Sequence, residues 1–264
     1  MASNSKPQDY FSKRSEEYAR YRPGYPEELF EWIAGLCERR NLAWDCACGS
    51  GQATVGIAKR FEQVIATDKS AAQLENAPKL QNVEWRRGEA EASCIVSRSV
   101  DLVAIAQALH WMNLGKFWAE CERVLKPGGV MAAWGYGIPE FADSGVDAVF
   151  HQYYHGTLKG VWPQERQLVE EGYSRVEFPF QEIMAPGFEI TREWNAEQIV
   201  GYCASWSVTE IYRQKTGRDP IPQLKIEMDK EARGDVFSLR WPVFVRTGRF
   251  VPRGTQLGAD LTKT

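Results

Sequence analysis

A turn built from small residues follows an early apolar run of the chain, with Ala47, Gly49 and Gly51 at alternate positions. Glycine lets the main chain bend sharply and approach a ligand closely, and a helix that starts there points free N–H groups at the ligand. The G-x-G-x-x-G pattern of dinucleotide sites is absent, since counting from Ala47 or Gly49 reaches Gln52 or Thr54. The turn therefore predicts a ligand site and disfavours NAD.

Carboxylates follow the next two predicted strands. Asp68 ends the run 64–67 and can accept hydrogen bonds from both hydroxyls of a ribose, although capping of the next helix is an equally common role for Asp. Glu89 and Ala90 follow the run 83–87, where a small residue and an acid could flank an adenine ring. The alternative for this pair is a solvated helix start.

A third group of polar residues follows the run 102–106. Gln107, His110 and Trp111 bring an amide, an imidazole and an indole to one place. A lone histidine is usually structural, but a position at the rim of a sheet favours contact with a ligand. His110 is therefore the candidate base or orienting group.

The elements that must position these residues alternate along the chain. Short apolar runs predict strands at 42–47, 64–67, 83–87, 102–106 and 130–134, and amphipathic spacing predicts helices at 25–40, 52–61, 71–77 and 116–125. Such alternation predicts an α/β fold, a parallel sheet with helices on both faces. Ligands of open parallel sheets bind beyond the carboxyl ends of the strands, where the polar residues lie.

The rest of the chain has a different character. Residues 138–234 are rich in aromatic side chains and are expected to form a mainly helical cap, followed by a closing strand at 237–250 with Pro242 at an edge or bulge. Trp206 and Tyr212 could wall a substrate, although their spacing also suits core packing. We expect one domain over 1–264, divided into 1–40, 41–137, 138–234 and 235–264.

Composition narrows the possible partners. The 264 residues carry 32 Lys and Arg against 35 Asp and Glu, a net charge of −3, so no basic field favours nucleic acid. No apolar stretch reaches the roughly 18 residues of a membrane span, and the polar start lacks a signal peptide's apolar core. The sequence thus predicts a cytoplasmic protein with a small-molecule substrate.

Metal and anion sites have weaker signals. Six dispersed cysteines indicate reduced thiols, and Cys46 with Cys48 has no second pair to complete a zinc site. His151 and His155 would share a helix face but lack the Glu of the H-E-x-x-H motif, so no metal is predicted. A basic stretch could recruit an anionic acid, although a solvated strand face explains most of it; it comprises Arg233, Arg240, Arg246, Arg249 and Arg253.

These motifs together resemble the class I S-adenosylmethionine-dependent methyltransferases of the methyltransferase type 11 group. The resemblance covers about residues 9–137 and rests on the runs 45–51, 68, 88–91, 99–103 and 123–129. It implies a Rossmann-like seven-stranded sheet with the last strand antiparallel and S-adenosylmethionine as cofactor. The loop 47–51 would lie beside its methionine part, Asp68 on its ribose and Glu89 with Ala90 near its adenine. Ala47 departs from the glycine usual in the family.

The segment before the sheet adds a finer resemblance. Tyr10-Phe11, Tyr18, Arg22-Pro23 and Tyr25-Pro26, with the run 107–111, are similar to the subgroup that contains trans-aconitate methyltransferases. The resemblance implies that this segment folds over the cofactor, with Tyr18 and Arg22 near its carboxylate and Gln107 also at the cofactor. A guanidinium suits a carboxylate, although an arginine before a proline also serves to cover a helix.

The function expected from the sequence is transfer of a methyl group to a small molecule, with O-methylation of an organic acid as the leading hypothesis. Trp111, Trp206 and Tyr212 are the expected substrate contacts, and His110 the catalytic residue. Transfer to carbon or nitrogen of a natural-product scaffold is an alternative. A cofactor-binding protein without turnover is another.

Overall fold

A twisted sheet forms the centre of the molecule in the computed structural model, which describes residues 21–232 and 236–252. Five parallel strands lie in the order β3-β2-β1-β4-β5. Their bounds are Leu42–Cys46 for β1, Gln63–Asp68 for β2, Val83–Arg87 for β3, Val100–Ala106 for β4 and Leu125–Tyr136 for β5. This order places the ends of β1, β2 and β4 side by side.

The last strand, β9 (Val236–Arg249), runs antiparallel to β5, and β7 (Gln181–Ile183) pairs with its far end. These seven strands form the sheet that the family resemblance implies. Two further strands pair with the first half of β9, so the whole sheet has nine strands; they are β6 (Glu140–Phe141) and β8 (Phe188–Asn195). The 14 residues of β9 span roughly 45 Å, long enough to serve both groups.

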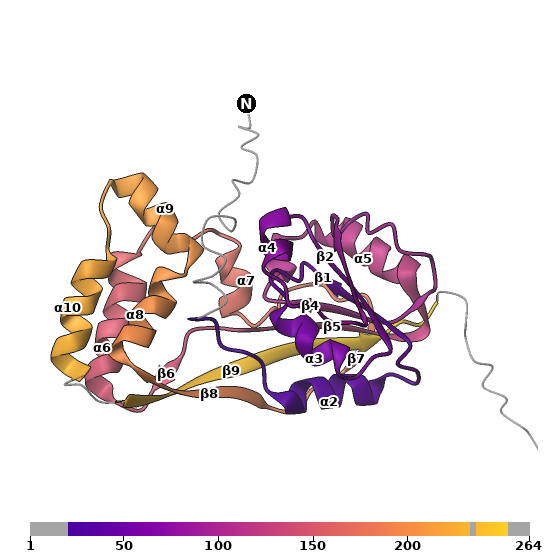
Figure 1. Cartoon of the computed structure of the whole chain (residues 1–264), viewed down its shortest axis with the longest axis horizontal. Helices are drawn as coiled ribbons and strands as arrows, with labels where there is room; N and C mark the ends of the chain where they lie inside the picture. The colour runs from indigo at the N-terminus through magenta and orange to yellow at the C-terminus, as the bar shows by residue number, and fades with distance from the viewer. Residues whose placement is uncertain (1–20, 233–235, 253–264) are drawn as a thin grey trace, which may run out of the picture.

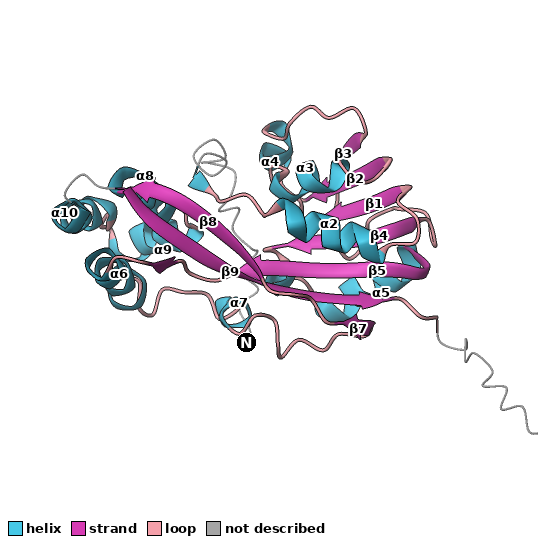
Figure 2. Cartoon of the chain, turned by 90° about the horizontal axis from the view of Figure 1, so that it is seen from below, coloured by secondary structure: helices cyan, strands magenta, loops and turns pink. Residues whose placement is uncertain are grey.

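Helices cover both faces of the sheet (Figure 2). Helices α2 (Glu27–Leu36) and α3 (Gln52–Ala58) pack in one apolar cluster, and α5 (Leu114–Val124) packs in the other. The short α4 (Ala71–Glu75) lies against β2 and β3. Helix α2 ends at Leu36, before the expected Arg40, where Cys37 takes an extended backbone conformation. The free carbonyls of the last turn accept from side chains, Ala34 from Arg40 and Leu36 from Arg249.

The cap lies beside the sheet and is joined to it by β8 and β9 (Figure 1). Its helices are α6 (Ser144–His151), the π-helix η2 (Gln152–Thr157), α7 (Arg166–Glu170), α8 (Ala196–Ala204), α9 (Ser207–Thr216) and α10 (Ile221–Ala232). The expectation of a mainly helical cap missed its strands. In β8, alternating Phe188, Ile190 and Trp194 point inward, a period of two that the aromatic composition obscured.

Pro242 lies inside β9, between the residues that pair with β6 and those that pair with β5. It therefore has a strand partner, Glu189 of β8, on one side only. This position suits a residue without an N–H donor and matches the expected edge placement.

Among the described residues, no helix is long and apolar enough to cross a membrane.

Candidate cofactor and acceptor site

Five described residues other than glycine have left-handed backbone conformations. Cys94 and Arg98 lie in the loop before β4, and the other three lie near the predicted site. Ala47 follows β1 with φ of 52°, Gln107 follows β4 with φ of 54°, and Tyr173 in the cap has φ of 57°. Residues other than glycine rarely adopt this conformation, and those that do cluster at functional sites. The backbone thus marks the region that the polar motifs of the sequence indicate.

Asp68 connects the ends of three strands. One carboxylate oxygen accepts from the Gly49 N–H at 2.9 Å and the other from the Ser70 N–H at 2.8 Å, while the Asp68 carbonyl accepts from the Gly88 N–H at 3.1 Å. Each carboxylate oxygen has a further lone pair for a ligand hydroxyl. Asp68 therefore holds the loop and the start of α4 and retains the capacity to bind ribose.

The two glycines of the loop have different surroundings. At Gly49 an added Cβ would meet nothing closer than 3.9 Å, which leaves the main chain open. At Gly51, with φ of 90°, a Cβ would come within 2.6 Å of the Trp85 ring. Packing against Trp85 therefore explains Gly51, and its contact with the cofactor stays a prediction, as does that of Ala47.

Asp45 lies beneath this loop and was not among the predicted site residues. Its side chain is fully buried, accepts a hydrogen bond of 2.5 Å from the Thr54 hydroxyl, and leaves Oδ1 without a partner. Burial raises the pKa of Asp45 to about 7, against the lowering effect of Thr54. The sequence signal that could have identified Asp45 is a carboxylate within an apolar predicted strand.

Glu89 and Ala90 follow β3 as expected. Ala90 is buried in the apolar cluster, while Glu89 is exposed and forms an isolated bridge with Ala92. The adjacent Glu91 accepts from the Asn113 N–H at 2.9 Å, so it supports the start of α5. The open main chain at Gly49, the Asp68 carboxylate and the small Ala90 are compatible with a nucleoside, and the contacts of Glu89 and Ala90 with adenine stay a prediction.

Gln107 is tied to the neighbouring strand. Its amide nitrogen donates to the Tyr136 carbonyl at 2.9 Å, and its backbone N–H donates to the Trp134 carbonyl at 2.9 Å. These bonds stabilise the left-handed conformation of Gln107. The structure thus assigns its side chain a structural role, beside which contact with the cofactor stays a prediction.

His110 lies in the short helix η1 (Leu109–Trp111) after β4. Its Nδ1 is 3.1 Å from the Tyr173 hydroxyl, and its ring stacks near that of Tyr173. Burial, followed by the positive charge of Arg166, lowers the pKa of His110 to about 3. The imidazole is therefore neutral at physiological pH, while the neighbouring Trp111 is 43% exposed.

Tyr173 and Arg246 were missed as a pair because they are far apart in sequence. The Arg246 guanidinium donates to the Tyr173 carbonyl at 2.7 Å and to the Val176 carbonyl at 3.3 Å, and pairs with Glu182. Arg246 thus holds the loop that presents Tyr173 to His110. Burial raises the pKa of Tyr173, so its hydroxyl stays protonated and available as a donor.

The other expected site residues lie toward the cap. Arg22 is stacked over the Tyr202 ring of α8, with its Cζ 5.6 Å from the centroid, while Tyr18 lies outside the described residues. Trp206 is buried among aromatic rings, and Tyr212 is partly buried against the same core. Both have packing explanations, so their contact with a substrate stays a prediction.

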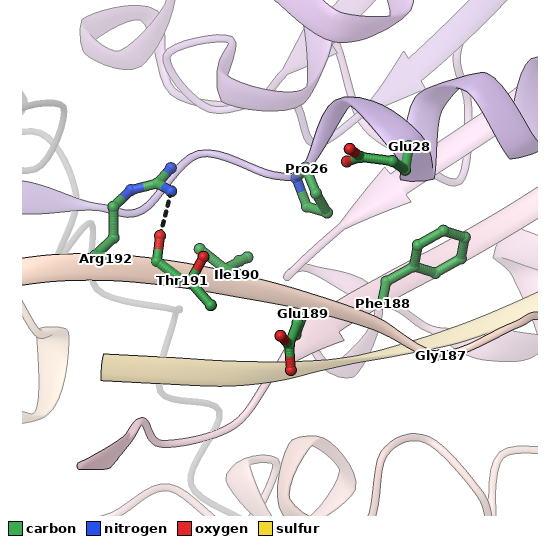
Figure 3. A pocket seen from close by; sticks show the side chains of 8 residues that line it. All are labelled: Pro26, Glu28, Gly187, Phe188, Glu189, Ile190, Thr191 and Arg192. Atoms are coloured by element: carbon green, nitrogen blue, oxygen red, sulfur yellow. Dashed lines mark hydrogen bonds between the residues drawn. The ribbon is translucent and has the colours of Figure 1, made fainter. Parts of the chain in front are cut away.

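A groove of about 350 Å³ lies between the start of α2 and β8 (Figure 3). It is lined by Pro26, Glu28 and residues 187–192, none of which is a predicted site residue. Arg192 in its wall donates to the Thr191 carbonyl at 2.7 Å and to the Gly24 carbonyl at 3.1 Å. The groove is therefore a structural junction between the N-terminal segment and β8.

Comparisons with known proteins agree with this architecture. Residues 44–133 match the family model described as methyltransferase domain. A protein of Dictyostelium discoideum named as a methyltransferase is 34% identical over 90% of this chain and 93% of its own length, and the methyltransferase cfoB of Aspergillus candidus is 29% identical over 75% and 70%.

A solved structure from Anaeromyxobacter dehalogenans, described as a type II methyltransferase, is 40% identical. It covers 88% of this chain and 99% of its own, with a TM-score of 0.80. The likeness thus extends through the cap, beyond the residues that match the family model. The chain belongs to the methyltransferase domain family and is an S-adenosylmethionine-dependent methyltransferase.

Proposed function

We propose that this enzyme methylates a carboxylate oxygen of a small organic acid, as its resemblance to the trans-aconitate subgroup implies. The observation that carries the proposal is the geometry of His110. Its Nδ1 lies 3.1 Å from the hydroxyl of Tyr173, which stays protonated and donates to it. Nε2 therefore carries the proton of the neutral imidazole and is a donor, not a base. The pKa of His110, about 3, also makes the imidazole too weak a base to deprotonate a phenol, enol or amine near neutral pH. An ionised carboxylate needs no base, and the acceptor then requires only positioning.

The chain's own residues divide the work. The main chain of Ala47 and Gly49 and the carboxylate of Asp68 would hold the cofactor, with Arg22 near its carboxylate. S-adenosylmethionine supplies a methyl group on a positively charged sulfur, and transfer to a carboxylate oxygen neutralises that oxygen and leaves sulfur as an uncharged thioether. His110, held by Tyr173, would orient the acceptor, and the cap would exclude water.

The reaction is tested with the full chain, labelled S-adenosylmethionine and separate panels of di- and tricarboxylic acids, phenols and amines. We expect the acids to give a labelled methyl ester. Treatment of this product with base should release labelled methanol. A base-stable product, or transfer only to phenols or amines, would contradict O-methylation of an acid.

The cofactor site is tested by calorimetry with S-adenosylhomocysteine. Asp68→Ala should weaken binding by about 1–3 kcal/mol, the scale of charge-assisted hydrogen bonds. Asp143→Ala is the matched control, because Asp143 likewise accepts from backbone N–H groups at a helix start, at Gly145 and Val146 of α6. Unchanged affinity in Asp68→Ala would remove Asp68 from the site.

A further inference from the structure

Arg166 is a cation placed between the cap and the sheet. It is the first residue of α7, which lies between the cap helices and the strand ends in Figure 1 and contacts η1. Its side chain is only 20% exposed. A mostly buried guanidinium has five N–H groups, and each of them needs a hydrogen-bond partner.

The partners of Arg166 account for one end of the guanidinium. Nε donates to the Tyr154 hydroxyl at 3.0 Å, and the plane lies over the rings of Tyr154 and Trp162, at 5.7 and 5.2 Å from their centroids. The Glu170 carboxylate forms an ion pair with Nε at 3.8 Å and also accepts a hydrogen bond from the Tyr154 hydroxyl. Among the described residues, neither terminal nitrogen donates a hydrogen bond.

The charge of Arg166 acts on the groups of the acceptor side. It contributes to lowering the pKa of His110 and opposes the burial that raises the pKa of Tyr173 and Tyr202. These three side chains come from η1, the loop after α7, and α8. The charge of Arg166 therefore acts on side chains from both the core and the cap.

The residue that orients Arg166 belongs to an unusual helix. Tyr154 lies in η2, a π-helix of six residues that continues α6. π-Helical turns are rare and are found frequently at functional sites. Here the wider turn places the Tyr154 hydroxyl between the Arg166 and Glu170 side chains, 2.5 Å from the Glu170 carboxylate, so the fold fixes one edge of the guanidinium.

The arginines of β9, which the sequence suggested as an anion site, are otherwise engaged. Arg240 pairs with Glu140 and Glu189, Arg246 with Glu182, and Arg249 donates to the Gly128 and Leu36 carbonyls. Arg233 and Arg253 lie outside the described residues. These contacts agree with the solvated strand face that the sequence also suggested, and recruitment of an anionic acid by these arginines stays a prediction.

We propose that Arg166 is the specificity-determining residue for the acceptor, and that its terminal nitrogens bind an anionic group remote from the atom that is methylated. This inference rests on the proposed function. A planar guanidinium held at Nε presents two parallel donors, the geometry that a carboxylate accepts. Acids with a second carboxylate should be preferred over analogues in which an amide replaces it.

The experiment compares a dicarboxylic acid with its monoamide, using the full chain. Turnover is measured as kcat/KM, and binding by calorimetry with S-adenosylhomocysteine present, which does not depend on turnover. The wild type should prefer the diacid about 10–100-fold, as one charge-assisted contact predicts. Arg166→Gln should abolish this preference, and Arg166→Lys should retain part of it.

Arg175→Gln is the matched control, because Arg175 follows the same helix and pairs with Glu171 while its side chain is 72% exposed. It should keep the wild-type preference, and all variants should keep their affinity for S-adenosylhomocysteine. Equal binding of diacid and monoamide by the wild type, or an unchanged preference in Arg166→Gln, would overturn the role of Arg166. If neither acid is methylated, the proposed function fails, and the binding comparison still decides on Arg166. The wild-type comparison remains decisive if Arg166→Gln does not fold.

Discussion

Individual residues at the strand ends are held in conformations that cost stability. Ala47 has φ of 52°, where the family usually has glycine, and its methyl group crowds the following carbonyl. Asp45, two residues earlier, buries a carboxylate with one unpartnered oxygen. Strain and unsatisfied groups of this kind persist where they serve a site. Both can be relieved by single substitutions.

Ala47→Gly should raise the free energy of unfolding by up to about 1 kcal/mol, because glycine adopts positive φ without a steric penalty. Ala43→Gly is the control, since Ala43 is buried in β1, the strand just before Ala47, and is absent from the residues with positive φ. It should destabilise the protein by about 1 kcal/mol. Urea unfolding measures both, and a loss of stability in Ala47→Gly would contradict the strain.

Asp45→Asn should change how stability depends on pH. The pKa of Asp45 is raised to about 7 in the folded chain from 3.8, so the folded state binds its proton more tightly. Its contribution to stability is full below pH 4 and is lost as pH rises through 7. Asp45→Asn should therefore gain stability relative to the wild type between pH 5 and 8, on the order of a few kcal/mol. The free energy of unfolding of both proteins is measured by urea unfolding at pH 5 and pH 8. The same change with pH in the wild type and in Asp45→Asn would contradict this prediction.

At the scale of elements, β9 supports the residues around His110, where we propose that the acceptor binds. Its Arg246 holds the loop of Tyr173, and Tyr173 in turn contacts His110 of η1. The arrangement depends on β9 running antiparallel beside both β5 and β7. A strand thus positions a histidine through Tyr173.

Arg246→Gln should lower the free energy of unfolding by about 1–3 kcal/mol, because it leaves buried carbonyls without their donor. It should also lower kcat/KM. Arg240→Gln is a control on the same strand, since Arg240 is 54% exposed where Arg246 is 18% exposed. Its exposed ion pairs contribute roughly 1 kcal/mol or less. Equal effects of the two substitutions would refute the supporting role of Arg246.

At the scale of the molecule, aromatic packing unites core and cap. Trp241 of β9 is fully buried and contacts Tyr136 of the core sheet as well as Trp194 and Tyr202 of the cap. Its apolar cluster continues from α2 into the cap helices. A cluster shared by α2, the sheet and the cap favours cooperative unfolding of core and cap.

Trp241→Ala should lower the free energy of unfolding by about 3–5 kcal/mol through the cavity it leaves. Trp111→Ala should cost far less, because Trp111 is 43% exposed. Urea unfolding followed by circular dichroism measures both. A similar loss in the two variants would show that Trp241 does not join the two parts.

The sequence by itself determined where the strands of the sheet end, and therefore which residues lie at their ends. The strand β3 begins and ends where its apolar run predicts, and Asp68 lies within hydrogen-bond distance of the loop at Gly49. The bounds of β3 are local, because strand period and turn chemistry are set by neighbouring residues. The contact of Asp68 with Gly49 follows from the parallel pairing of β1 and β2. The alternative role of Asp68 as a helix cap is wrong, because the N-cap of α4 is Ser70, whose N–H donates to the Asp68 carboxylate. The ribose role of Asp68 stays a prediction.

Only the tertiary structure decided the acceptor side. Arg166 and Tyr173 are close in sequence, but Tyr173 is 63 residues from His110 and 73 residues from Arg246, and no sequence spacing links these groups. The β9 arginines have the same residue type as Arg166, but the strand partners of β9 and the neighbouring carbonyls already engage them. Whether a charged side chain keeps a free donor depends on what packs around it, and that packing follows from contacts between residues distant in sequence.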